Sequence, residues 1–289
     1  MNDLTFSYLD NDAPANTALD AFVRAHPEGN AYQLAGWRRA VADAYGYPGK
    51  VLVARRAGEL AGMLPLCAVA RPLGRPRWIS LPFCDLGGAL ADSSAVNDAL
   101  AARARQDLAA TRAAGLELRG SAAGGQDDAA LAGRKVRMVL TLPESAAALM
   151  QSYPPKLRSQ VRKAEKNGLT AELASGPAAI DAFYDVYSRN MRRLGSPPHS
   201  RAWFDAMERH YGAGGDMFIM LVRHEGKAVG AGWVLLCGDK AVIPWASTLA
   251  DYNALAPNML LYWAIQSQLC ERGVRQFDFG RSTFGEGTY

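Results

Sequence analysis

The sequence predicts a mixed α/β (α+β) fold in two similar halves, and three observations support this. Val51–Gly62 aligns with Ile219–Gly230 at a constant offset, and each copy reads as a strand, a glycine-containing turn and a second strand. Further along, Ala114–Gly120 parallels Arg272–Gly280, which places another strand late in each half. Between the strands, apolar residues recur at the three- and four-residue spacing of amphipathic helices. Strands and helices that alternate in this order predict sheets flanked by helices.

The individual elements follow from periodicity and from capping residues. A chain of 289 residues is long enough for two domains, and we expect these to span residues 1–145 and 146–289. Ser200 is a suitable N-cap for a helix, and Gly273 is a suitable helix stop. The predicted helices cover residues 32–45, 100–114, 154–167, 201–211 and 257–270. The stretch Gly120–Gly133 is rich in Gly, Ala and Asp and predicts a linker or surface loop.

Charge is unevenly distributed along the chain. The net charge is only +4, and residues 153–168 alone hold five basic residues and one acidic residue. The rest of the chain is therefore close to neutral. A local basic patch on a neutral body indicates a local anionic partner and argues against general nucleic-acid coating.

Cysteine usage and hydropathy indicate the compartment. The four cysteines are scattered in apolar contexts, which predicts buried free thiols in a reducing compartment. Neither they nor the four histidines show metal-ligand spacing, so no metal site is expected. The N-terminus lacks signal-peptide features, and no apolar run approaches the ~20 residues of a transmembrane helix. We therefore expect a cytoplasmic protein with at most peripheral membrane contact.

The predicted helix at 154–167 carries two stripes of side chains. The buried stripe consists of Leu157, Val161 and Ala164, and the basic stripe beside it of Arg158, Arg162 and Lys166. Like charges four residues apart cost about 0.2–0.5 kcal/mol per pair unless an anion lies against them. Two interpretations are open: recognition of a phosphate or polyphosphate, which suits the planar guanidinium, or a solvated basic face. The neutral remainder of the chain favours the first.

The C-terminal segment is the second candidate. Asp278 ends a predicted strand and Arg281 follows in a glycine-rich loop, an arrangement that often forms a substrate site. An Asp–Arg pair that only holds the loop in place is the alternative. We expect this turn and the basic stripe to enclose one pocket for an anionic substrate.

Several of these segments resemble FemAB-like proteins. The strongest matches are Pro154–Leu169, Asn190–Pro197, Asn258–Trp263 and Phe277–Ser282, with weaker ones at Gly62–Leu66, Ser80–Phe83 and the Gly87-Gly88 pair. The resemblance covers most of the chain, and is strongest from about residue 150 to residue 289. It is closest to the Gram-negative branch associated with exosortase systems.

The resemblance implies two tandem GNAT-like (acetyltransferase-fold) domains. It implies an enzyme that transfers an acyl or aminoacyl group to an amine of a phosphate-bearing cell-envelope precursor, as the members that form peptidoglycan bridges do with aminoacyl-tRNA. Asp278 is then the expected catalytic proton acceptor. The expected substrate-binding residues are Lys156, Arg158, Arg162, Asn258 and Arg281. No cofactor is expected to stay bound, because the acyl donor is a co-substrate.

Two alternatives remain. The donor could be acyl-CoA or an acyl carrier protein, although the loop at 248–257 has no Gly, Lys or Arg for a pyrophosphate and carries Asp251. The chain could also be a degenerate, non-catalytic binding module. The family pattern continues into a strand with a Phe-Lys pair beyond Tyr289, so we expect the last sheet to lack that strand.

Overall fold

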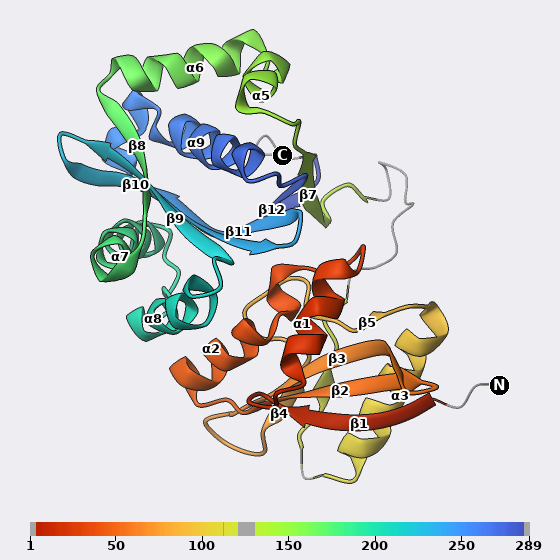
Figure 1. Cartoon of the computed structure of the whole chain (residues 1–289). Helices are drawn as coiled ribbons and strands as arrows, with labels where there is room; N and C mark the ends of the chain where they lie inside the picture. Colours follow the sequence, from red (N-terminus) through yellow and green to blue (C-terminus); the bar gives the residue numbers. More distant parts are fainter. Residues whose placement is uncertain (1–3, 112, 121–130, 286–289) are drawn as a thin grey trace. The chain divides into compact units, whose positions relative to one another are not determined.

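The computed structural model describes residues 4–111, 113–120 and 131–285, and the chain forms two compact units, Met1–Asp127 and Asp128–Tyr289 (Figure 1). The sequence placed the boundary at 145/146 instead. The difference arises because strand β7 (Lys135–Thr141) pairs with β12 (Gln276–Thr283), the last strand of the second unit. A pairing between segments so far apart in the chain leaves no local signal in the sequence.

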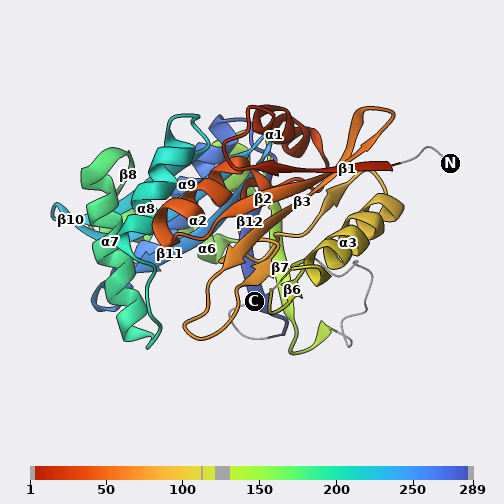
Figure 2. The same ribbon diagram turned by 90° about the horizontal axis from the view of Figure 1, so that it is seen from below.

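The first unit is a six-stranded sheet with helices packed against it. Its elements are β1 (Leu4–Asp10), α1 (Asn16–Ala25), a 3-10 turn (Ala31–Gln33), α2 (Ala35–Tyr45), β2 (Gly49–Arg56), β3 (Glu59–Val69), β4 (Arg77–Ile79), β5 (Leu90–Ala91), α3 (Ser94–Ala109) and β6 (Leu116–Glu117). The strand order is β1-β2-β3-β4-β6, with β5 paired to β3. Only the β4–β6 pair among these is parallel. Helix α3 packs on β2 and β3 through Val96, Leu100 and Ala104 (Figure 2).

The second unit repeats this plan with longer strands. Its elements are β7, α5 (Ala146–Ser152), α6 (Pro155–Lys166), β8 (Leu169–Ala174), α7 (Gly176–Arg193), α8 (Arg201–Met207), a π-turn (Glu208–Gly212), β9 (Met217–His224), β10 (Lys227–Cys237), β11 (Lys240–Thr248), a 3-10 turn (Ala250–Leu255), α9 (Pro257–Glu271) and β12. The strand order is β7-β12-β11-β10-β9-β8. The pair β11–β12 is parallel, as β4–β6 is in the first unit.

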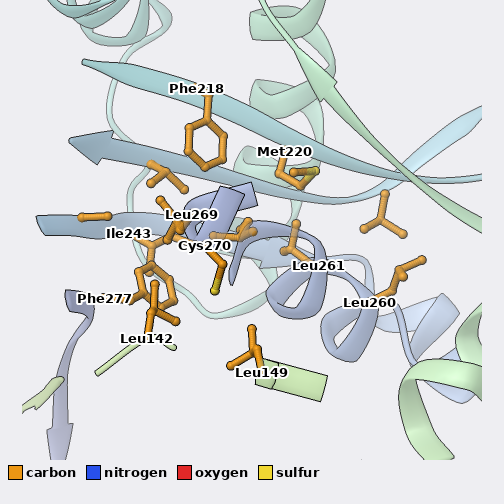
Figure 3. Packing of buried hydrophobic residues seen from close by; sticks show 14 of the residues in the cluster. Leu142, Leu149, Phe218, Met220, Ile243, Leu260, Leu261, Leu269, Cys270 and Phe277 are labelled. Carbon is orange, nitrogen blue, oxygen red and sulfur yellow. The ribbon is translucent and has the colours of Figure 1, made fainter. Parts of the chain in front are cut away.

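Helices cover both faces of the second sheet. Helices α5, α6 and α9 lie on one face, and α7 and α8 lie on the other (Figure 1). The core under α9 is formed by apolar side chains from the helix and the strands (Figure 3). Its large buried members include Leu149, Phe218, Ile243, Leu261, Leu269 and Phe277. Since α9 is buried on several sides, its sequence is apolar almost all round.

The internal repeat is confirmed by the two hairpins β2–β3 and β9–β10. Their turns have the same backbone, with Ala57 and Gly58 in one and Glu225 and Gly226 in the other all at positive φ. A two-residue turn with positive φ at both central residues matches the right-handed twist of the two strands that it joins. The later parallel strand of each half, β6 and β12, is also where the repeat predicted it.

Most predicted helices are present with shifted ends. The basic helix and the helix opened by Pro257 are confirmed as α6 and α9. The Ser200 hydroxyl caps α8 by accepting from the N–H of Trp203, as predicted. Helix α3 begins at Ser94, six residues before the predicted start, and α2 is preceded by a separate 3-10 turn. The predicted linker Gly120–Gly133 lies mostly outside the described residues.

Two further expectations concern single features. All four cysteines are buried and free, as predicted. Among the helices that the structure describes, none has the length and apolar character needed to cross a bilayer.

Candidate functional site

The central feature of the second unit is an opening between β11 and β12. The two strands pair at three positions only, from Lys240↔Gln276 to Val242↔Asp278. Both strands then continue, β11 to Thr248 and β12 to Thr283. The backbone beyond the last pair therefore has no partner across this gap in the ladder.

Both strands owe this parting to an extra residue just after the last pair. On β11, Val242 pairs with Leu235 but Trp245 pairs with Trp233, so the strand bulges around Pro244. Proline has no N–H to give to a ladder, and bulges are where sheets tolerate it. A bulge bends its strand and increases the local twist, which turns β11 away from β12.

On β12, the register against β7 shifts in the same way between Asp278 and Arg281. Gly280 lies inside this bulge with φ +86°, a left-handed conformation that glycine adopts without steric cost. Both bulges therefore begin directly after the last β11–β12 pair, Val242↔Asp278.

The Asp278 carboxylate holds the β12 bulge closed. It is only 6% exposed; one oxygen accepts from the backbone N–H of Gly280 at 2.8 Å and the other from Nε of Arg137 at 2.6 Å. Arg137 lies on β7 and is 43% exposed. An Asp–Arg pair therefore does fix this turn, but the arginine comes from β7. Arg281, the partner suggested by the sequence, is exposed on β12 beyond the bulge.

Sequence reasoning missed Arg137. In the structure its strand alternates exposed and half-buried residues, but nothing local in the sequence indicated which strand it would join. Only the pairing of β7 with β12 brings the guanidinium to Asp278.

The basic stripe lies over a hollow of about 460 Å³. Its lining residues are Pro155, Arg158, Ser159, Arg162, Lys163, Lys166 and Asn167. Arg158 is partly committed elsewhere, because its guanidinium donates to the carbonyls of Gln151 and Tyr153 at the end of α5. Within the described part of the chain, no ion pair is recorded for Arg162, Lys163 or Lys166. This concentrated positive charge suits an anion.

The remaining predicted residues lie elsewhere. Lys156 is exposed near the start of α6 and does not line this hollow. Asn258 is exposed in the first turn of α9. No residue of β12 lines the hollow, so the single pocket expected from the basic stripe and the C-terminal turn is not found there. Helix α9 separates them, since it lies between α6 and the sheet (Figure 1).

The opposite face of the sheet has an aromatic layer beside the opening. Trp245 of β11 is 9% exposed and makes edge contacts with Trp203 and Phe204, so it packs in the core. His199 stacks on Trp203, and burial lowers the pKa of its imidazole to about 4. The ring is therefore neutral near pH 7. The sequence offered no signal that His199 would pack in this aromatic layer.

A polar contact connects this face to helix α7. The Asn190 amide donates to the Ser247 hydroxyl at 3.2 Å. The residues described by the structure contain no cluster of His, Cys, Asp and Glu that could hold a metal ion.

Comparisons with known proteins agree with this geometry. Residues 152–289 match the family of acetyltransferase (GNAT) domains. A crystal structure of FemX aligns with 97% of this chain and 90% of its own, with a TM-score of 0.75 and 16% identity. The chain has a tandem GNAT-like fold, similar to that of FemX.

Two further proteins are similar to this chain. A UDP-N-acetylmuramoylpentapeptide-lysine N(6)-alanyltransferase of Weissella viridescens is 24% identical over 139 residues. The match takes in 47% of this chain and only 40% of that curated relative. A tandem GNAT protein from the clavulanic acid biosynthesis pathway shares the fold over 99% of the chain, with a TM-score of 0.55 and 13% identity.

Proposed function

We propose that the chain is an acyltransferase that moves an acyl or aminoacyl group onto an amine of a phosphate-bearing cell-envelope precursor. The observation that carries this proposal is the opening between β11 and β12 in a GNAT-fold sheet. The Weissella relative supports the acceptor class, because its name describes alanyl transfer to the lysine of a UDP-linked muramoylpentapeptide.

The reaction is attack of an amine on an activated carbonyl. A bond forms between nitrogen and the carbonyl carbon, the bond to the donor's leaving group breaks, and the amine loses a proton. We propose that the opening holds the two reactants together. Positioning them in this way removes a large part of the activation barrier for such a step. Beyond Val242, the backbone N–H groups of β11 that point away from β10 lack a β12 partner. Such a group can stabilise the carbonyl oxygen as it gains charge.

Asp278 is our proposed proton acceptor, and it lies at the last paired rung before the strands part. Its two oxygens already accept from Arg137 and Gly280, so its first role is to position the strand. A carboxylate has further lone pairs, and an amine proton can be taken by an oxygen that already accepts one bond. Asp278→Asn keeps the acceptor for Gly280 but removes the charge, and we expect turnover to fall without loss of precursor binding.

The basic hollow on α6 is our proposed site for the precursor's phosphates. Arg158, Arg162 and Lys166 supply several donors on one helix face, and guanidinium groups bind phosphate oxygens in pairs. We propose Lys156 as a further phosphate contact. Arg281 on β12 and Asn258 in the first turn of α9 are proposed to contact substrate nearer the opening.

The donor is proposed to be aminoacyl-tRNA. The loop that precedes α9, residues 249–256, lacks Gly, Lys and Arg, and it carries the exposed Asp251. This loop therefore lacks the groups that usually bind an anionic pyrophosphate, which argues against acyl-CoA as the donor. Transfer of a radiolabelled group from charged tRNA, compared with acyl-CoA and acyl carrier protein, identifies the donor.

Binding of inorganic pyrophosphate tests the phosphate site. We expect Arg162→Ala to weaken it about tenfold, because a hydrogen bond to a charged group is lost. Arg105→Ala on the exposed face of α3 removes the same charge far from α6 in the sequence and serves as control. Equal affinity in wild type, Arg162→Ala and Arg158→Ala rejects the phosphate site. Absence of transfer from all three donors would reject the enzymatic function. The chain would then be interpreted as a non-catalytic binding module.

A further inference from the structure

The loop at residues 80–88 of the first unit holds an exposed aromatic residue in a strained conformation. Phe83 has φ +65°, and its side chain is 37% exposed. Among the described residues, the other non-glycine residues with positive φ are Ala57, Glu225 and Ala256. The first two make hairpin turns, and Ala256 precedes the first turn of α9. Phe83 lies in neither setting.

The backbone around Phe83 is fixed by contacts from distant elements. The indole N–H of Trp37 on α2 donates to the carbonyl of Pro82 at 2.9 Å. The Arg119 guanidinium donates to the carbonyls of Leu81 and Cys84, both at 3.3 Å. A Cβ added to Gly87 would lie 2.5 Å from Cβ of Leu81, so the loop can close only with glycine there. These contacts hold Phe83 in place from both sides.

Two tyrosines extend the aromatic surface. The centroids of the Phe83 ring and the Tyr45 ring, at the end of α2, lie 4.7 Å apart, and the two ring planes are tilted by 42°. The Tyr45 ring lies 5.9 Å from that of Tyr47, nearly parallel at 19°. All three side chains retain exposure to solvent. We call Tyr45, Tyr47 and Phe83 the aromatic platform.

The strain and the exposure together point to a ligand. A left-handed conformation at a bulky residue costs free energy and persists only where the surroundings enforce it. Burial of Phe83 would offset this cost, but the residue is 37% exposed. Such over-determined outliers concentrate at ligand sites.

We infer that the aromatic platform stacks a nucleobase of a nucleotide-containing substrate. Stacking on tyrosine and phenylalanine needs no directed hydrogen bonds, since every base presents a π-face. The Trp37 and Arg119 groups next to Phe83 already donate to loop carbonyls, so the contact offered by the platform is its π-surface. This inference rests on the proposed function, in which either the UDP-linked acceptor or the tRNA donor brings the base.

The experiment compares three probes: UDP, an RNA minihelix ending in CCA, and pyrophosphate, which has no base. We expect Phe83→Leu to weaken UDP or the minihelix roughly tenfold, because stacking is lost while apolar bulk remains. Whichever probe responds identifies the source of the base. Leu73→Ala changes an apolar side chain that is 89% exposed in the same unit and should leave all three affinities unchanged.

Phe83→Gly separates ligand binding from folding. Glycine removes the backbone strain, so this variant should unfold at a temperature no lower than Phe83→Leu while also losing base affinity. Unchanged UDP and minihelix affinity in both variants overturns the inference. Pyrophosphate binding that ignores Arg162, together with UDP binding that depends on Phe83, overturns only the phosphate site.

Discussion

Replacing Arg137 by alanine tests whether the β12 bulge depends on its bond to Asp278. In the variant the carboxylate would stay buried and would keep only the Gly280 N–H. A buried acceptor left unsatisfied costs about 1–3 kcal/mol, and breaking a fully buried ion pair costs about 3–5 kcal/mol. Because Arg137 is 43% exposed, water reaches the pair and screens it. We therefore expect a loss of about 2 kcal/mol.

The loss is measured by urea unfolding of the full chain, with helical CD and tryptophan fluorescence followed together because the two units can unfold separately. A 2 kcal/mol loss in a unit of this size corresponds to a fall in Tm of roughly 4–8 °C. Arg162→Ala removes an exposed arginine from α6 of the same unit. It should stay within about 0.5 kcal/mol of wild type.

A double-mutant cycle with Asp278→Asn isolates the pair itself. Contacting charged groups should show a coupling free energy of at least about 1 kcal/mol, whereas independent sites add within about 0.5 kcal/mol. Additive effects, or an Arg137→Ala variant as stable as Arg162→Ala, would refute the role given to this bond.

Two further predictions concern single residues of the second unit. Gly280→Ala should destabilise by about 1–2 kcal/mol in urea, since its Cβ would meet no neighbouring atom and the cost is the positive φ alone; no change would mean that the bulge is not strained. His199 has a pKa lowered from 6.5 to about 4 by burial, so the folded chain favours the neutral ring and its contribution is complete above pH 6.5. Stability should fall by up to about 3 kcal/mol as the pH drops from 6.5 to 4, and His199→Phe should flatten this part of the curve; an equal slope in both proteins would contradict the assignment.

The fold was predictable where signals were local. Amphipathic spacing and caps located α6 and α9, and the repeated glycine turns located both hairpins. The two-domain division was also readable from the repeat, but β7 was assigned to the wrong side of the predicted boundary. Its partner β12 lies at the other end of the unit, and strand pairing at that distance is decided by the folded sheet.

The site was predictable only in its residue types. Asp278 was predicted to end its strand, whereas β12 continues to Thr283. Its arginine partner comes from β7 and is not the neighbouring Arg281. Pro244 was overlooked, because its effect appears only when β10 and β12 are seen on its two sides. The basic stripe was correct as a surface, while α9 keeps it apart from the C-terminal turn.

The two copies of the repeat differ where the chemistry is proposed. Strands β4 and β6 pair at two positions and both end near there, so the described part of the first unit has no long strand ends to separate. The chain after β4 instead enters the loop of Phe83, at the point where β11 runs on beside the gap. Our proposals thus assign the reaction to the C-terminal copy and recognition of the nucleobase to the N-terminal copy. Evolved changes in substrate preference should collect in the N-terminal half, and changes that abolish turnover in the C-terminal half.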